Sequence, residues 1–208
     1  MNADLTPILT ALGIQDWCRE HQAHGRRAAR LALTVYEGHQ RDQGTPYLEH
    51  PVAVVRILRT ELSVSEPTTL TLGLLHDALE VAPHTADQIT AGLGEAFTDR
   101  LRAMTPDHRL QQRAKHAGDD AAWRSKTTTL DATGLLVRFA DRVHNLRDLQ
   151  HSPDAARRSR YLLALADFYL PLADAVAHLH PPLAAARDLL RAEYTRAEAH
   201  QREVAVQE

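Results

Sequence analysis

Apolar residues recur at intervals of three and four along most of the chain, which is the spacing of one face of an α-helix. Alternating apolar and polar runs and hairpin turns are absent from the sequence, so we expect an all-α fold. A polar stretch from Thr105 to about Thr129 predicts a mobile loop with some helix. The periodic segments predict helices at about residues 4–12, 14–38, 50–62, 68–81, 95–104, from 130 to a break at Ser152-Pro153, 154–178 and 183–204.

The composition supports this helical interpretation. Alanine, leucine and arginine dominate the sequence, and aromatic residues make up only 5% of it, a mixture that favours helix over sheet. A chain of 208 residues without a low-complexity linker is long enough for one substantial core. We therefore expect a single domain over residues 1–208, with extra terminal helices on either side of the central part.

Charge and cysteine content exclude several classes of protein. The net charge is −3, so no basic excess indicates a nucleic-acid partner. Cys18 is the only cysteine, so no disulfide framework exists, and a reducing compartment fits. The start Met1-Asn2-Ala3-Asp4 lacks the features of a signal peptide, and no uninterrupted apolar run looks long enough to span a bilayer. We expect a cytoplasmic protein without a membrane partner, and the amphipathic tail indicates core packing or a homodimer contact.

Candidate chemistry is concentrated at His76 and Asp77, which lie side by side in the apolar run Leu72–Glu80. Apolar helices rarely carry three ionisable groups in five positions unless something offsets their desolvation, and a divalent cation would do so. In a continuous helix Glu80 lies one turn beyond His76 on the same face. The run therefore predicts a metal site.

Two further positions extend the predicted ligand set. His50 opens a helix, and Asp141 follows an apolar half-helix. Two imidazoles and two carboxylates suit Mn²⁺, Fe²⁺ or Zn²⁺ better than Ca²⁺, and they lack the thiolates of structural zinc sites. Because the residues belong to three separate predicted helices, they converge only if the bundle brings those helices together.

Each of these residues also has a plainer interpretation. His50 could be a polar surface residue, Asp141 could form a surface ion pair with Arg142, and His76 and Asp77 could be a hydrogen-bonded core pair. If these residues do not form a metal site, all three of these interpretations must hold at once. They do not explain why polar groups interrupt apolar helices at these places.

Four ordered blocks of sequence resemble the HD-domain metal phosphohydrolases, and in particular the hydrolase domain of the RelA/SpoT alarmone enzymes and their small single-domain relatives. Gly44–Pro51 matches that family's G-x-P-Y-x-x-H-P, and Leu74–Glu80 resembles L-L-H-D-x-x-E-D. Phe139–Arg147 resembles L-A-D-R-x-H-N-x-R, and Tyr169–Ala173 resembles Y-A-P-L-A. Each block is weak alone, but together they cover roughly residues 26–176 in the family's order.

The resemblance implies an all-helical HD fold that binds one Mn²⁺ and removes the 3′-pyrophosphate from guanosine tetra- or pentaphosphate in the stringent response. It also implies a role for individual residues of this chain. Glu80 would orient or activate the attacking water, Arg41 would pack on the guanine base, and Asn145 would contact the nucleotide. The implied metal ligands are His50, His76, Asp77 and Asp141.

Two departures from the family pattern leave alternatives open. Val81 stands where the family has the Asp of H-D-x-x-E-D, and Asp42 stands where it tends to have a Lys. One acidic group of the predicted acid–base pair is therefore missing, and an anion replaces a cation near an anionic ligand. The chain could instead be a degenerate HD domain that regulates by binding a nucleotide, or an HD phosphohydrolase with another nucleotide substrate.

Overall fold

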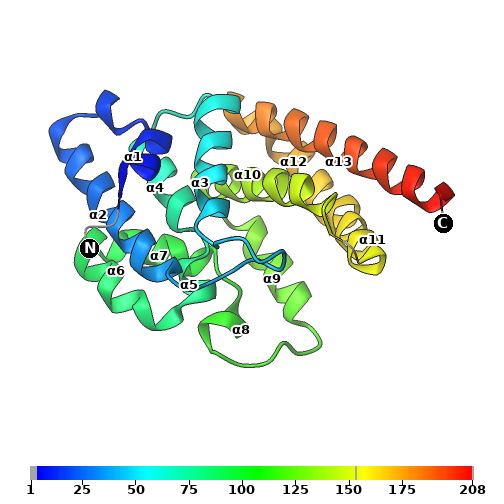
Figure 1. Cartoon of the computed structure of the whole chain (residues 1–208), viewed down its shortest axis with the longest axis horizontal. Coiled ribbons are helices and arrows are strands. Elements are labelled where there is room, and N and C mark those ends of the chain that lie inside the picture. The colour runs from blue at the N-terminus through cyan, green and yellow to red at the C-terminus, as the bar shows by residue number, and fades with distance from the viewer. Residues whose placement is uncertain (1–3, 153, 208) are drawn as a thin grey trace. The chain divides into compact units, whose positions relative to one another are not determined.

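The structure is a computed structural model that describes residues 4–152 and 154–207 (Figure 1). In these ranges every named element is helical, and the one recorded β-type pairing is an isolated antiparallel bridge between Gln40 and Pro46. The all-α prediction is confirmed. The predicted break at Pro153, and the first three residues used to argue against a signal peptide, lie outside the described residues.

The chain divides into two compact units, Met1–Val137 and Arg138–Glu208. The boundary between them falls inside the helix α10, Ala132–Leu149. The first unit contains η1 (Ile14–Asp16), η2 (Ile57–Glu61), η3 (Pro83–Thr85), and the α-helices α1 (Thr6–Leu12), α2 (Arg19–Tyr36), α3 (Glu49–Arg56), α4 (Pro67–Leu75), α5 (Ala78–Val81), α6 (Ala86–Leu93), α7 (Glu95–Ala103), α8 (Asp107–Leu110) and α9 (Asp119–Thr128). The expectation of one domain over the whole chain remains a prediction.

Helix α2 shows how the hydrophobic pattern builds the first unit. Its apolar residues at helical spacing are buried, as the sequence predicts: Ala28, Ala29, Leu31, Ala32 and Val35. The predicted helix over 14–38 is shorter, however, because Trp17 and Cys18 adopt extended backbone and separate α2 from η1.

Close packing of α3 against α4 brings the first two candidate ligands together. Both helices present buried apolar faces, and Gly73 of α4 lies beneath Leu58 at the start of the π-helical turn η2. A Cβ atom at Gly73 would stand 2.7 Å from Leu58 Cδ1, closer than side chains tolerate. The absence of a side chain at Gly73 therefore lets the two helices approach each other next to His76.

The predicted helix over 68–81 is wrong in one respect, because it is broken at the His76-Asp77 doublet. Helix α4 ends at Leu75, Asp77 has φ −97° and ψ 1°, and α5 begins at Ala78. The Asp77 carbonyl accepts hydrogen bonds from the backbone N–H groups of Glu80 and Val81. The doublet therefore forms a turn between two helices, and the argument that Glu80 shares a continuous helix face with His76 does not hold.

The polar stretch after Thr105 contains the helices α8 and α9, so the prediction of some helix there is confirmed. Ion pairs connect different parts of this stretch. Lys126 Nζ lies 2.6 Å from Asp107 Oδ1 and donates to the Thr105 carbonyl, and Arg113 contacts both carboxylate oxygens of Asp119.

The second unit begins within α10 and continues through α11 (Ala155–Ala164), η4 (Leu165–Tyr169), α12 (Leu170–Val176), η5 (Ala177–Leu179) and α13 (Pro181–Gln207). The segment Ala155–Leu179 is long and apolar enough, by length and composition alone, to cross a membrane, with a mean hydropathy of 1.4 over its most apolar 18 residues. It is not an uninterrupted apolar run, because Asp167 and Asp174 lie within it. Its buried residues include Leu162, Leu165 and Ala173, and α12 packs on α13, where Arg191 pairs with Asp174. We therefore interpret this segment as a core helix.

Candidate metal centre

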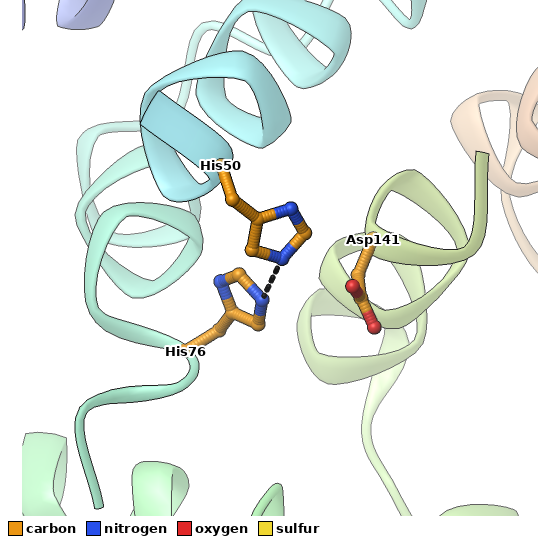
Figure 2. A group of neighbouring side chains, drawn as sticks. All are labelled: His50, His76 and Asp141. Atoms are coloured by element: carbon orange, nitrogen blue, oxygen red, sulfur yellow. Dashed lines mark hydrogen bonds between the residues drawn. The ribbon is translucent and has the colours of Figure 1, made fainter. Parts of the chain in front are cut away.

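Two histidines meet where α3 begins and α4 ends. His50 lies in the first turn of α3, where Pro51 is tolerated because its missing N–H would have no partner within the helix, and His76 is the C-terminal cap of α4. Each is only 1% exposed, and their Nε2 atoms are 3.3 Å apart, as the dashed line in Figure 2 shows. The interpretation of His50 as a polar surface residue is therefore wrong.

Asp77 places a carboxylate oxygen beside both imidazoles. Its Oδ2 atom is 3.4 Å from His50 Nε2 and 3.2 Å from His76 Nε2. The residue is 7% exposed, and its position in the turn between α4 and α5 turns the carboxylate toward the two rings. His50, His76 and Asp77 thus form a buried His-His-Asp group within the first unit.

A backbone hydrogen bond sets the tautomer of His76. Its Nδ1 atom lies 2.8 Å from the Gly73 carbonyl oxygen, which can only accept, so Nδ1 carries the proton. In the neutral ring Nε2 then presents a lone pair toward His50 and Asp77. A carbonyl that holds the other ring nitrogen in this way is typical of histidines that bind metals.

The donor atoms of this group fit a divalent cation. Two ring nitrogens and a carboxylate oxygen, all buried, lie 3.2–3.4 Å apart. Ligand atoms about 2.1 Å from one ion are separated by about 3.0 Å in octahedral and about 3.4 Å in tetrahedral geometry. The three separations in this group fall in this range, and a cation between the atoms would take the place of the hydrogen bonds that join them.

The electrostatics of Asp77 agree with a site for positive charge. Burial acts to raise the pKa of the Asp77 carboxyl, but the charge that His76 carries when protonated, together with hydrogen bonds from both imidazoles, outweighs burial and holds this pKa well below its usual value. Burial, and then the charge of Asp77, raise the pKa of Tyr47 well above its usual value. Asp77 is therefore an anion and Tyr47 a neutral donor.

Tyr47 is a site residue to which the sequence argument assigned no role. Its O–H donates a hydrogen bond of 2.9 Å to Asp77 Oδ2, and its ring stacks on Tyr36 with centroids 5.5 Å apart. The sequence feature that could have indicated Tyr47 is its position three residues before His50, which is close enough along the chain for both side chains to face one site. Its partner could not be read from the sequence, since Asp77 is thirty residues away along the chain.

Asp141 lies in the second unit, in the middle of α10, and is drawn with its helix in Figure 2. Its side chain is 2% exposed, which is incompatible with a surface ion pair. Three neighbours on the same helix hold it. Arg138 and Arg142 donate to Oδ2, and Asn145 donates to Oδ1 over 2.6 Å.

Glu80 and Arg41 both belong to the first unit. Glu80 is in α5, one turn after the doublet, and its Oε1 atom is 3.7 Å from Arg109 Nε of α8. Arg41 lies in the turn before α3, where its N–H donates to the Thr45 carbonyl. Val81 is half-buried at the end of α5, and Asp42 is exposed.

A family model described as "HD domain" matches residues 28–176 of this chain, a span that includes every candidate ligand. The chain belongs to the HD-domain family. The matched span includes the His76-Asp77 doublet that separates α4 from α5.

Curated relatives of this HD domain include alarmone enzymes. The bifunctional (p)ppGpp synthase/hydrolase SpoT of Escherichia coli is 32% identical over 164 residues, which are 77% of this chain and 23% of SpoT. The guanosine-3′,5′-bis(diphosphate) 3′-pyrophosphohydrolase MESH1 of Mus musculus is 32% identical over 109 residues, 51% of this chain and 58% of that protein. The chain thus spans about a quarter of SpoT.

A solved structure supports the fold. It comes from work titled "A metazoan ortholog of SpoT hydrolyzes ppGpp and plays a role in starvation responses", and it matches with a TM-score of 0.60 at 20% identity. The match covers 89% of this chain and 94% of the other. This protein is therefore an HD domain that resembles ppGpp hydrolases, and its buried His-His-Asp group has the donor atoms that a metal site needs.

Proposed function

We propose that this HD domain is a guanosine-3′,5′-bis(diphosphate) 3′-pyrophosphohydrolase that uses one Mn²⁺ ion. The observation that carries the proposal is the buried group of His50, His76 and Asp77, with donor atoms at the spacing of metal ligands. The similarity to SpoT and MESH1 supports the choice of substrate.

Asp141 is proposed as the fourth ligand. It is the buried aspartate of the third resembling block, and the family model matches continuously from the first block to the fourth. Nitrogen and oxygen donors without thiolates suit Mn²⁺. When bound, such an ion lowers the pKa of water and polarises a phosphoryl oxygen.

The remaining proposed roles follow from the chemistry of each side chain. Glu80 would accept a proton from the attacking water, for which a carboxylate close to the site is suited. The planar guanidinium of Arg41 would stack on the guanine base. Asn145, an amide donor one turn from Asp141, would contact the nucleotide.

A nucleotide panel tests the proposed reaction. The purified protein is incubated with Mn²⁺ and with guanosine tetraphosphate, deoxynucleotides, nucleoside monophosphates or phosphorylated dinucleotide cofactors, and the products are identified. We expect guanosine tetraphosphate to give GDP and pyrophosphate. Turnover of another compound without turnover of guanosine tetraphosphate would reject the proposed substrate, but the proposal that the protein is an enzyme would stand.

One structural feature favours a second candidate, a nucleotide-binding regulator without catalysis. Glu80 is paired with Arg109, and Val81 supplies no second carboxylate. Calorimetry separates the two candidates. Tight binding of guanosine tetraphosphate without hydrolysis under Mn²⁺, Zn²⁺, Fe²⁺ or Mg²⁺ would support the regulator.

We also propose that the protein acts in the cytoplasm and that the amphipathic helix α13 can contribute to a homodimer. The interpretation of Ala155–Leu179 as a core helix supports the first statement. Sedimentation at several protein concentrations tests the second, and a monomer throughout would reject it.

A further inference from the structure

The carboxylate of Asp141 is held by an unusually concentrated set of donors. Arg142 contributes two nitrogens to Oδ2, Nε at 3.1 Å and Nη2 at 2.7 Å. Arg138 Nη1 approaches the same oxygen at 2.9 Å, from one helical turn earlier. Asp141 is 2% exposed, so these charge-assisted bonds form away from bulk water, where they are strongest.

Arg142 is itself held by two tyrosine rings of the second unit. Its guanidinium carbon lies 5.0 Å from the centre of the Tyr169 ring and 5.8 Å from that of Tyr161, within the range of cation–π attraction. The Tyr161 hydroxyl is buried and makes no hydrogen bond within the described residues. The Tyr161 ring contributes to the contact through its face.

These contacts link two distant parts of the sequence. Tyr169 comes from η4 and Arg142 from α10, and both belong to blocks that resemble the alarmone hydrolases. Without the tyrosines a long arginine side chain would sample many rotamers. With them, the guanidinium is fixed where it bonds one oxygen of Asp141.

We propose that Arg142 is a positioning residue for the metal centre, which Tyr161 and Tyr169 hold in place so that it fixes the carboxylate of Asp141 for metal binding. The inference rests on the proposed function, because it takes Asp141 as a ligand. Groups that hydrogen-bond a metal ligand orient it, and their removal typically lowers metal affinity by about 10- to 100-fold. The positive charge of Arg142 would also repel a nearby cation and so weaken its binding. Whether the loss of Arg142 lowers or raises the Mn²⁺ affinity therefore shows which of the two effects is larger.

Metal titration of Arg142 variants tests the inference. The metal-free full chain is titrated with Mn²⁺ by calorimetry, and thermal unfolding is measured without metal. We expect Arg142→Met to lower the Mn²⁺ affinity by about 10- to 100-fold. Arg142→Lys keeps the charge but loses the paired nitrogens, and we expect it to recover only part of the affinity.

Matched variants separate positioning from general destabilisation. Tyr169→Leu removes the ring and should weaken Mn²⁺ binding, whereas Tyr169→Phe keeps the ring face and should weaken it less. Arg160→Met removes an exposed guanidinium of α11 that pairs with Asp154, and it should leave the affinity unchanged.

Unchanged or tighter Mn²⁺ binding by Arg142→Met would overturn the inference, and so would equal losses for Tyr169→Phe and Tyr169→Leu. Wild-type protein that binds no divalent ion would reject the proposed function together with this inference. Wild-type protein that binds Mn²⁺ without hydrolysing the alarmone would reject only the substrate, because the titration does not depend on turnover.

Discussion

The hydrogen bond from Tyr47 to Asp77 gives a prediction at the scale of single residues. Tyr47→Phe removes an O–H donor from a buried carboxylate, and hydrogen bonds to charged groups contribute about 1.5–3 kcal/mol. We expect the free energy of unfolding to fall by a similar amount and the Mn²⁺ affinity to fall about tenfold. Denaturant unfolding and calorimetry measure the two effects.

Tyr194→Phe is the matched control. Its hydroxyl donates to the Glu198 carboxylate within α13, so its loss removes the same kind of hydrogen bond and should spare Mn²⁺ affinity. Equal affinities for Tyr47→Phe and the wild type would show that Tyr47 does not position Asp77.

Val81→Asp tests whether the missing carboxylate limits the reaction. Val81 is half-buried at the end of α5, so an aspartate there can reach water and should leave the fold intact. We expect the turnover of guanosine tetraphosphate to rise at least about tenfold, the lower range of general acid–base effects. Val81→Asn is the control for shape without charge, and an equal rate for both variants would contradict the prediction.

At this scale the sequence predicted two members of the first unit's group from one apolar run. His76 and Asp77 stand out there because burying ionisable residues requires a partner that offsets their desolvation. His50 lies outside that run and was proposed from its place at a helix start. The partners themselves were not predictable. The contacts of Tyr47 with Asp77 and of Glu80 with Arg109 depend on how distant segments pack.

At the scale of elements, the cap of α4 stabilises the helix that carries His76. The Glu66 carboxylate accepts hydrogen bonds from the backbone N–H groups of Thr68 and Thr69. We expect Glu66→Ala to lower the free energy of unfolding by about 1 kcal/mol, the usual effect of losing an N-cap. Glu20→Ala is the control, because α2 has no side-chain hydrogen bond at its cap.

The same cap predicts a pH dependence. Burial acts to raise the pKa of Glu66, but the hydrogen bonds from Thr68 and Thr69 outweigh it and lower this pKa. A lowered folded-state pKa gives stability that is present above the unfolded value of about 4.3 and is lost as the pH falls through the folded value. The stability difference between wild type and Glu66→Gln should therefore shrink below pH 4.3, and a constant difference would contradict the assignment.

Helical periodicity predicted the elements but not their breaks. The run over 68–81 looks continuous because both α4 and α5 are apolar, yet the chain turns at Asp77. Apolar spacing reports which residues are buried, and Leu74, Leu75, Ala78 and Leu79 are buried on both sides of the turn. A turn between two buried helices leaves that pattern unchanged, so nothing in it could mark the break.

At the scale of the whole molecule, metal binding should stabilise the folded chain. A ligand that binds only the folded state adds about 2.7 kcal/mol at 100 times its dissociation constant. We expect this excess of Mn²⁺ to raise the unfolding temperature by about 5–10 °C, and a chelator to reverse the rise. His76→Asn should abolish the effect, and an equal rise in that variant would place the ion elsewhere.

The ligand set as a whole rests on the order of the sequence blocks, because its members are spread over two units. His50, His76 and Asp77 belong to the first unit, and Asp141 belongs to the second. Periodicity places each of them on a helix but does not say which helices meet. The resemblance to a known ligand order supplied that information, and for Asp141 it remains a prediction.

Anomalous diffraction from crystals of the Mn²⁺-loaded protein tests this ligand set most directly. The account predicts one anomalous peak about 2.0–2.2 Å from a nitrogen of His50, a nitrogen of His76 and a carboxylate oxygen of each of Asp77 and Asp141. A peak elsewhere, or any of the four side chains turned away from it, would contradict the account.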